Sequence, residues 1–277
     1  MGDNGAAAHQ ARPGAGVDPA PLLPIAREAV ARARRIIHTR RPASVAEKGE
    51  RDLVTDVDLA VEDAVREFLA RETPEIGILG EEHGRSGDPG AVWWALDPVD
   101  GTSNFARGIP LCAVSLGLVS GRRSVLAAID LPFLGTTYTA VEGLGARAGD
   151  ERIRVSAAAD LSRAVISVGD FAIGDGAATK NRLRLALLDR LGARAQRIRM
   201  LGTAAIDLAW VAHGKLEATI ILANLPWDTM AGTLLVREAG GLVLDRDGSD
   251  HTTDSAATIA VCPGLRGELM RMLSDVD

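Results

Sequence analysis

The chain has 277 residues, of which 47% are hydrophobic and 25% charged, and its formal net charge is −6. This size and apolar content suit one large domain or two closely packed halves with a substantial core. The acidic balance and the 3% aromatic content argue against a general nucleic-acid surface with base-stacking side chains. No apolar run is long enough to span a bilayer. We therefore expect neither a nucleic-acid nor a membrane partner.

Residues 1–17 are rich in Gly, Ala and Pro and lack a basic start followed by an apolar core. We interpret them as a disordered leader rather than a secretory signal. The two cysteines, Cys112 and Cys262, lie far apart inside apolar runs. This placement is typical of buried thiols and not of a disulfide or a metal pair. The sequence thus predicts a reduced, cytoplasmic location.

Two helices are predicted before the first strand. Asp18 is the expected cap of the first helix, with Pro19 in its first turn and an apolar face that runs to Ile37. Thr55 or Asp56 can cap the second helix. That start places Asp58 in the first helical turn, where the helix dipole favours a carboxylate. Helix capping and metal binding both remain open for the acids of this segment, Asp52, Asp56 and Asp58.

Two apolar strands end in acidic residues a short distance apart in the chain. Residues 76–79 lead into Gly80-Glu81-Glu82, and residues 93–96 lead into Asp97-Pro98-Val99-Asp100-Gly101-Thr102-Ser103. Ligands of open α/β sheets gather at strand ends, so these acids predict a site, although Asp and Gly are also ordinary turn formers. The residues after Asp100 begin a helical turn whose backbone N–H groups suit a phosphate. Carboxylates beside a phosphate repel it unless divalent cations lie between them, which predicts a metal-bridged phosphate site.

The middle of the chain predicts an antiparallel meander. Strand-length segments at 112–118, 124–130 and 136–141 are separated by turns that contain Gly121 and Gly135. The following Gly143-Leu144-Gly145-Ala146 comes after a hairpin strand and opens no helix. We therefore do not interpret it as a dinucleotide-binding loop.

The second half alternates strands and helices, which predicts a sheet with helices packed on it and an α/β class for the chain. Expected strands are 165–168, 196–199, 216–222 and 258–261, and expected helices are 181–191, 203–212, one from Pro226, and 264–273. Thr203 and Ala204 could contact a substrate through their N–H groups, or Thr203 could simply cap its helix. Asp228 could likewise be a helix cap or a metal ligand. We expect Asp245 to Asp250 to form a hairpin turn rather than a calcium loop, because the closing Glu is missing.

Taken together, several motifs resemble the inositol monophosphatase family. They are Asp52-Leu53-Val54-Thr55 with Asp58, Gly80-Glu81-Glu82, Asp97-Pro98-Val99-Asp100-Gly101-Thr102, Gly202-Thr203-Ala204, and Trp227-Asp228 with Glu238-Ala239-Gly240-Gly241. The resemblance runs from about residue 20 to the C-terminus. It implies a layered α-β-α-β-α sandwich, Mg²⁺-dependent hydrolysis of phosphate monoesters with two or three ions, and a homodimer. We expect an N-terminal half, 18–156, with most metal ligands, and a C-terminal half, 157–277, that completes the site.

The family pattern carries over to individual residues of this chain. It implies metal ligation by Glu81, Asp97, the carbonyl of Val99, Asp100 and Asp228. It assigns activation of the attacking water to Glu81, Thr102 and Asp58. Phosphate and substrate contacts would come from Gly101, Thr102, Ser103, Thr203 and Ala204.

One position departs from the family pattern. Inositol-selective members carry an acid seven residues before the Trp-Asp aspartate, where this chain has Ile221. An apolar side chain leaves sugar hydroxyls unpaired there, so the expected substrate is a small polyol or sugar monophosphate whose identity stays open. Histidinol phosphate, fructose bisphosphate, a nucleotide and a secondary-metabolite intermediate are alternatives, and a non-catalytic interaction protein on the same fold is a further one. Lys48 lies near a family lysine but has one residue fewer between it and Asp52.

Overall fold

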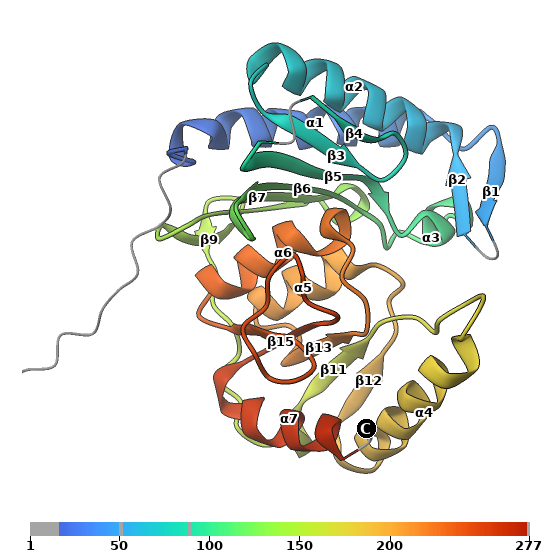
Figure 1. Cartoon of the computed structure of the whole chain (residues 1–277), viewed down its shortest axis with the longest axis vertical. Coiled ribbons are helices and arrows are strands. Elements are labelled where there is room, and N and C mark those ends of the chain that lie inside the picture. Colours follow the sequence, from blue (N-terminus) through green and yellow to red (C-terminus); the bar gives the residue numbers. More distant parts are fainter. Residues whose placement is uncertain (1–16, 50–51, 88–89, 276–277) are drawn as a thin grey trace, which may run out of the picture.

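The computed structural model describes residues 17–49, 52–87 and 90–275. The predicted leader therefore lies outside the described residues except for Val17. Within them the chain stacks helices and sheets in alternate layers, as Figure 1 shows. From one end these layers are α1 (Leu23–Thr39) with α2 (Asp56–Glu72), a large sheet, α5 (Ala204–Ala212) with α6 (Pro226–Glu238), a smaller sheet, and α4 (Ala177–Arg194) with α7 (Arg266–Ser274). The predicted α-β-α-β-α sandwich is confirmed.

The larger sheet carries the predicted meander. Its order in the described residues is β10-β9-β8-β7-β6-β5-β3-β4, and only the β3–β5 pair is parallel. Its strands are β3 (Gly77–Gly80), β4 (Gly84–Ser86), β5 (Val92–Asp100), β6 (Ala113–Ser120), β7 (Arg123–Leu131), β8 (Thr136–Val141), β9 (Gly145–Ala148) and β10 (Glu151–Arg152). The parallel β3–β5 pair brings the two acidic strand ends to the same edge of the sheet.

The smaller sheet has the order β12-β11-β13-β15-β14 in the described residues. Its strands are β11 (Val165–Val168), β12 (Arg197–Arg199), β13 (Ala218–Ile221), β14 (Leu242–Leu244) and β15 (Thr258–Val261). Strands β12, β11 and β13 are parallel, whereas β15 is antiparallel to both of its neighbours. The parallel strands therefore point their carboxyl ends toward one edge.

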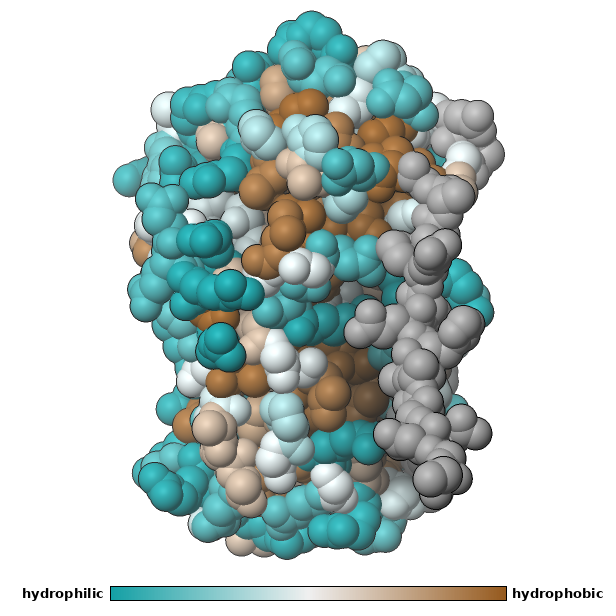
Figure 2. All heavy atoms as spheres, turned by 90° about the vertical axis from the view of Figure 1, so that its left-hand side faces the viewer, coloured by the Kyte–Doolittle hydropathy of each residue, from teal (hydrophilic) through white to brown (hydrophobic). Residues whose placement is uncertain are grey.

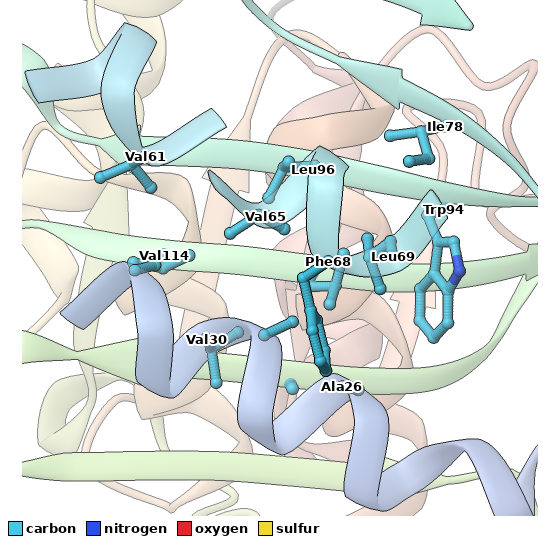
Figure 3. Packing of buried hydrophobic residues seen from close by; sticks show 14 of the residues in the cluster. Ala26, Val30, Val61, Val65, Phe68, Leu69, Ile78, Trp94, Leu96 and Val114 are labelled. Carbon is cyan, nitrogen blue, oxygen red and sulfur yellow. The ribbon is translucent and has the colours of Figure 1, made fainter. Parts of the chain in front are cut away.

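Apolar side chains of α1 and α2 form the core against the outer face of the larger sheet. Ala26 and Val30 of α1 and Val65 and Phe68 of α2 lie in one cluster with the fully buried Trp94 of β5 (Figure 3). Burial of side chains of this size contributes about 1.5–3 kcal/mol each. This packing fixes β5, and with it the turn at its end.

Four local features of the structure differ from the sequence analysis. Asp18 does not cap α1: its carboxylate accepts the N–H of Ala20 at 3.1 Å, and a 3-10 turn, Ala20–Leu22, precedes the helix. A hairpin of β1 (Val45–Gly49) and β2 (Asp52–Thr55) was not predicted, because β1 is exposed along its length and shows no alternation of apolar residues. β14 was also missed, and α4 starts four residues earlier than the predicted 181.

The surface and the two cysteines complete the description of the fold. No helix in the described part of the chain is long and apolar enough to cross a membrane. Figure 2 shows the side of the molecule away from α3 (Thr102–Ala106), where hydrophobic patches alternate with hydrophilic residues. Cys112 and Cys262 are both free and buried.

Candidate active site

The turn between β5 and α3 is shaped by its own side chains. The carboxylate of Asp97 accepts the N–H of Val99 at 2.9 Å, and the register between β5 and β6 shifts between Asp97 and Asp100. Gly101 has a φ of 94°, which L side chains rarely adopt, and α3 starts directly after it at Thr102. A Cβ on Gly101 would lie 2.9 Å from the carbonyl oxygen of Leu111. Only glycine fits this turn without strain.

Glu81 reaches the same edge of the sheet from β3. Its N–H donates to the carbonyl of Leu96 at 3.2 Å, which extends the pairing of β3 with β5 by one residue. The buried carboxylate of Glu62 on α2 accepts the N–H of Glu82 at 2.8 Å and that of His83 at 3.0 Å. Glu62 therefore holds the turn that carries Glu81. The sequence analysis missed it, although its ion pair with Arg66, four residues later on the helix, was a signal.

Asp58 lies in the first turn of α2, as predicted. Thr55 is the helix cap, and the two residues form a reciprocal capping box in which Thr55 N–H donates to Asp58 at 3.1 Å. The hydroxyl of Thr102 donates to the other carboxylate oxygen of Asp58 at 2.9 Å, and it also lies 3.0 Å from the carbonyl oxygen of Val99. Capping and the contact with Thr102 therefore occur together.

Asp100 links the β5–α3 turn to the start of α5. Its carboxylate accepts the hydroxyl of Thr203, the N–H of Ala205 at 2.6 Å and the N–H of Ala204 at 3.3 Å. The Thr203 hydroxyl also accepts the N–H of Ile206 at 3.3 Å, so Thr203 caps α5. Thr203 and Ala204, which the sequence assigned to substrate, are thus turned toward Asp100.

Asp228 lies in the first turn of α6 but does not cap it. The cap position is Leu225, and no side chain makes a capping hydrogen bond there. The preceding residue is fixed by Ser115 of β6, whose hydroxyl donates to the carbonyl of Trp227 at 3.1 Å. Of the two alternatives for Asp228, the structure rules out the helix cap.

One cavity of about 420 Å³ lies at this edge of the sheet. It is lined by Lys48, Glu81, Asp97, Val99, Asp100, Gly101, Thr102, Leu225, Trp227 and Asp228. The cavity therefore contains the five residues that the family resemblance implies as metal ligands, whereas Asp56 and Asp58, for which metal binding was also open, do not line it. Ser103 lines an adjoining cavity of about 330 Å³, which shares Gly101 and Thr102 with the first.

The acidic side chains of this cavity disfavour one another's charge. Burial raises the pKa of Asp97 well above its usual range, and the charges of Glu81, Asp100 and Asp228 raise it further. Burial also raises the pKa of Asp228, and the charges of Asp100 and Glu81 raise it further. Burial raises the pKa of Asp100 to about 6 in spite of its hydrogen bonds to Thr203 and Ala205. Such a group of carboxylates calls for a cation among them.

Lys48 supplies one positive charge at the rim. Its ammonium group lies 2.7 Å from Glu81 and 2.9 Å from Glu82. Burial lowers the pKa of Lys48, but the two hydrogen-bonded carboxylates outweigh this effect and raise it. The β1–β2 hairpin therefore brings Lys48 to the site even though its spacing from Asp52 departs from the family pattern.

The donor chemistry of the cavity fits a hard divalent cation. The candidate ligands are carboxylate and carbonyl oxygens, which Mg²⁺ and Ca²⁺ prefer over imidazole and thiolate donors. The charges of Glu81 and Asp228 both raise the pKa of Asp97, so these carboxylates repel one another. In this arrangement, no three His, Cys, Asp or Glu side chains among the described residues are spaced to hold a metal ion. What fits a metal here is that the candidate donors are all oxygen atoms and that their negative charges repel one another.

The adjoining cavity contains residues that the sequence analysis did not single out. It is lined by Leu53, Asn104, Asp170, Met200, Leu201 and Gly202 as well as by the start of α3. A separate cavity beside α4 is lined by Thr179, Leu222 and Ala223, among others, whereas Leu225 lines the acidic cavity.

Comparisons with known proteins agree with this geometry. Residues 18–275 match the model of the inositol monophosphatase family. The chain is 35% identical over 233 residues to inositol-1-monophosphatase ImpA of Mycolicibacterium smegmatis, with 84% of each chain covered. It is 38% identical over 206 residues to Nus factor SuhB of Xylella fastidiosa, with 74% of each chain covered.

Solved structures give the same answer for the fold. The extragenic suppressor protein suhB of Bartonella henselae has a TM-score of 0.85 and 34% identity, with 91% of this chain and 98% of that chain covered. The IMPase of Thermotoga maritima has a TM-score of 0.84 and 30% identity, with 92% of this chain and 98% of that chain covered. The family resemblance seen in the sequence is therefore confirmed. This chain belongs to the inositol monophosphatase family, whose members are metal-dependent phosphoric monoester hydrolases.

Proposed function

We propose that this protein hydrolyses a small polyol or sugar monophosphate in a Mg²⁺-dependent reaction. The observation that carries the proposal is the convergence of Glu81, Asp97, Asp100 and Asp228 on one cavity beside the start of α3. These residues come from β3, β5 and α6, which only the folded chain brings together. A shared acidic cavity next to backbone N–H groups is the arrangement that a metal-bridged phosphate needs.

Within this proposal, Mg²⁺ ions are held by the carboxylates of Glu81, Asp97, Asp100 and Asp228 and by the carbonyl of Val99. When bound, two or three such ions neutralise the phosphate, lower the pKa of a water molecule and stabilise the departing ester oxygen. The protein contributes a rigid frame, because Asp100 is fixed by three donors of α5 and its cap. Fixed ligands need little reorganisation during the reaction.

The phosphate lies at the turn that begins α3. Gly101, Thr102 and Ser103 present their backbone N–H groups there, and the φ of 94° at Gly101 lets the backbone approach without a side chain in the way. We assign phosphate binding to these three residues. Thr203 and Ala204 support the site by holding Asp100.

Asp58 and Thr102 form the path for the water proton. Thr102 Oγ1 donates to Asp58 Oδ1 at 2.9 Å, so it can accept a proton from the attacking water as it passes its own to the carboxylate. Burial raises the pKa of Asp58, which makes it a better proton acceptor than an exposed aspartate. The water oxygen bonds to phosphorus as the bond from phosphorus to the ester oxygen breaks. The ester oxygen takes a proton from solvent and leaves as the alcohol, and Asp58 later returns its proton to solvent. Glu81 is the second candidate for activating the water.

A panel of phosphate monoesters tests the proposal directly. The purified chain is assayed for phosphate release from p-nitrophenyl phosphate, glycerol phosphate, inositol 1-phosphate, fructose bisphosphate, histidinol phosphate and a nucleoside monophosphate, with and without millimolar Mg²⁺. We expect Mg²⁺-dependent release from polyol or sugar monophosphates. Release from none of them, or equal release in the presence of a chelator, contradicts the proposal.

We also propose that the protein is a cytoplasmic homodimer, as its family membership favours. Size-exclusion chromatography with light scattering measures the mass in solution against the 29.0 kDa of one chain. A single-chain mass at micromolar concentration would contradict the dimer without touching the catalytic proposal.

A further inference from the structure

Building on the proposed phosphatase function, we infer that Asp170 recognises the alcohol part of the substrate. Its carboxylate accepts hydrogen bonds from free hydroxyl groups, so the substrate class is a polyol monophosphate. In this chain Asp170 would replace the acid that inositol-selective relatives carry at the position of Ile221.

Asp170 and Ile221 lie at the carboxyl ends of neighbouring parallel strands. β11 and β13 pair in register from Ile166 with Ala218, and the N–H of Gly169 donates to the carbonyl of Ile220 at 2.9 Å. A Cβ built on Gly169 would lie 3.5 Å from the Cα of Ile221. Asp170, just beyond β11, therefore lies one strand across from Ile221 at the end of β13.

Asp170 lies near the turn at Gly101 and Thr102, to which we assign phosphate binding. A Cβ on Gly202 would lie 3.8 Å from Oδ2 of Asp170, and a Cβ on Gly101 would lie 3.2 Å from the carbonyl oxygen of Gly202. The two glycines thus bring Asp170 next to the start of α3 with little side-chain bulk between them. Asp170, Gly101, Thr102 and Gly202 line the same cavity of about 330 Å³, which adjoins the acidic one. A phosphate held at Gly101 and Thr102 would leave its alcohol within reach of Asp170.

The turn that carries Asp170 is anchored before any ligand arrives. The guanidinium of Arg184, a residue only 7% exposed, donates to the carbonyl of Asp170 at 2.9 Å and to that of Leu222 at 3.4 Å. Asn181, one turn earlier on α4, exchanges two hydrogen bonds with the backbone of Ala172, at 2.8 and 2.9 Å. Asp170 itself is exposed to solvent. Its carboxylate is therefore fixed by its backbone yet available to a ligand, which is the arrangement that gives specificity at low entropic cost.

Free hydroxyl groups suit this site better than an ammonium group does. The guanidinium of Arg184 donates to the backbone carbonyl of Asp170 at 2.9 Å, so a positive charge already lies at this turn. An ionised carboxylate accepts hydrogen bonds from neutral hydroxyls, whereas a second cation near the guanidinium would be repelled. We therefore choose the polyol over an amino alcohol.

Steady-state kinetics of Asp170→Ala and Asp170→Asn test the inference on three kinds of probe. Glycerol phosphate and inositol 1-phosphate carry free hydroxyls, p-nitrophenyl phosphate carries none, and 2-aminoethyl phosphate carries an ammonium group. We expect Asp170→Ala to lower kcat/KM for the polyol phosphates by about 10- to 100-fold, which is the usual effect of losing hydrogen bonds to a charged group. The value for p-nitrophenyl phosphate should change by less than about 3-fold. Asp170→Asn keeps one hydrogen-bond acceptor, so its kcat/KM for the polyol phosphates should lie between the values for Asp170→Ala and the wild type.

Asp189→Ala is the matched control, because it removes another exposed carboxylate, on α4. It should leave all three probes unchanged. Equal losses on p-nitrophenyl phosphate and the polyols would assign Asp170 a structural role and overturn the inference, as would a loss confined to 2-aminoethyl phosphate. If the wild type hydrolyses p-nitrophenyl phosphate and Asp170→Ala leaves the polyols unaffected, this inference alone is wrong. If the wild type hydrolyses no ester, the proposed function is wrong and this inference with it.

Discussion

The carboxylate of Asp100 accepts the N–H of Ala205 at 2.6 Å although 105 positions separate the two residues in the chain. This hydrogen bond joins the end of β5 in the larger sheet to the first turn of α5, which lies between the two sheets. The acidic cavity is therefore complete only when the two sheets are docked on the central helices.

We predict that Asp100→Asn lowers kcat by several orders of magnitude. The amide keeps the size of the side chain and can still accept the N–H of Ala205, but it removes the negative charge that a divalent cation needs. The kcat for p-nitrophenyl phosphate with saturating Mg²⁺ measures the effect, and Asp189→Asn is the control. Near-normal turnover in the variant would exclude Asp100 from the reaction. A non-catalytic interaction role of the fold, by contrast, would survive this substitution.

We predict that Mg²⁺ stabilises the wild-type fold. A cation that binds only the folded chain adds about 2.7 kcal/mol at a concentration 100 times its Kd, which corresponds to a rise of several degrees in Tm. Differential scanning calorimetry with and without millimolar Mg²⁺ measures the shift, with Asp97→Asn/Asp228→Asn as a variant in which it should vanish. An unchanged wild-type Tm would count against an assembled metal site.

Gly101→Ala should disrupt both stability and phosphate binding. The new Cβ meets the carbonyl oxygens of Leu111 at 2.9 Å and Gly202 at 3.2 Å, in addition to the strain of a φ of 94°. We expect a loss of about 3 kcal/mol or more in the free energy of unfolding, together with a raised KM.

Gly108→Ala separates strain from crowding. Gly108 has a similar φ of 72°, but nothing lies within 4 Å of its added Cβ. We expect the free energy of unfolding, measured with urea, to fall by only about 1 kcal/mol, because backbone strain is the sole cost at this position. Equal losses at the two glycines would mean that the contacts of Gly101 are unimportant.

We predict that His251 makes the fold sensitive to mild acid. Burial, together with the charge of Arg237, lowers the pKa of this side chain to about 4, whereas the unfolded value is near 6.5. As the pH falls from 6.5 toward 4, the unfolded chain takes up a proton that the folded chain refuses, so stability falls by up to about 3 kcal/mol. Urea unfolding is measured between about pH 7.5 and about pH 4, a range that spans these two pKa values. As the pH falls, the free energy of unfolding should decline more steeply for the wild type than for His251→Gln. Parallel curves for the two proteins would assign the acid sensitivity to other groups.

The sequence predicted the elements in which apolar periodicity is strong. β8, β11 and β15 have the predicted bounds, because buried strands leave a continuous apolar record. The β1–β2 hairpin left no such record, since β1 is exposed along its length and one of its residues, Lys48, serves the site through a long polar side chain. Its pairing follows from tertiary position and not from local pattern.

The residues of the site also fall into those that a local pattern predicts and those that depend on tertiary position. The acids that follow β3 and β5 were predicted from strand ends, but their meeting with Asp228 rested on the family resemblance, since no local pattern relates α6 to β5. Glu62 and Asp170 were missed because their roles depend on which backbone atoms lie nearby after folding. Contacts of this kind cannot be read from spacing along the chain.

The central helices have a consequence for how the molecule comes apart. α6 contacts β6 and β7 of one sheet and β14 and β15 of the other, and α5 contacts both sheets as well. If one sheet departs, either its own inner face or the side of α5 and α6 that it covered becomes exposed to water, so the two halves are not protected independently. The acids of the cavity come from β5, the residue after β3 and the first turn of α6, and α6 contacts β5. Separation of α6 from the larger sheet would therefore also disperse this cluster of like charges.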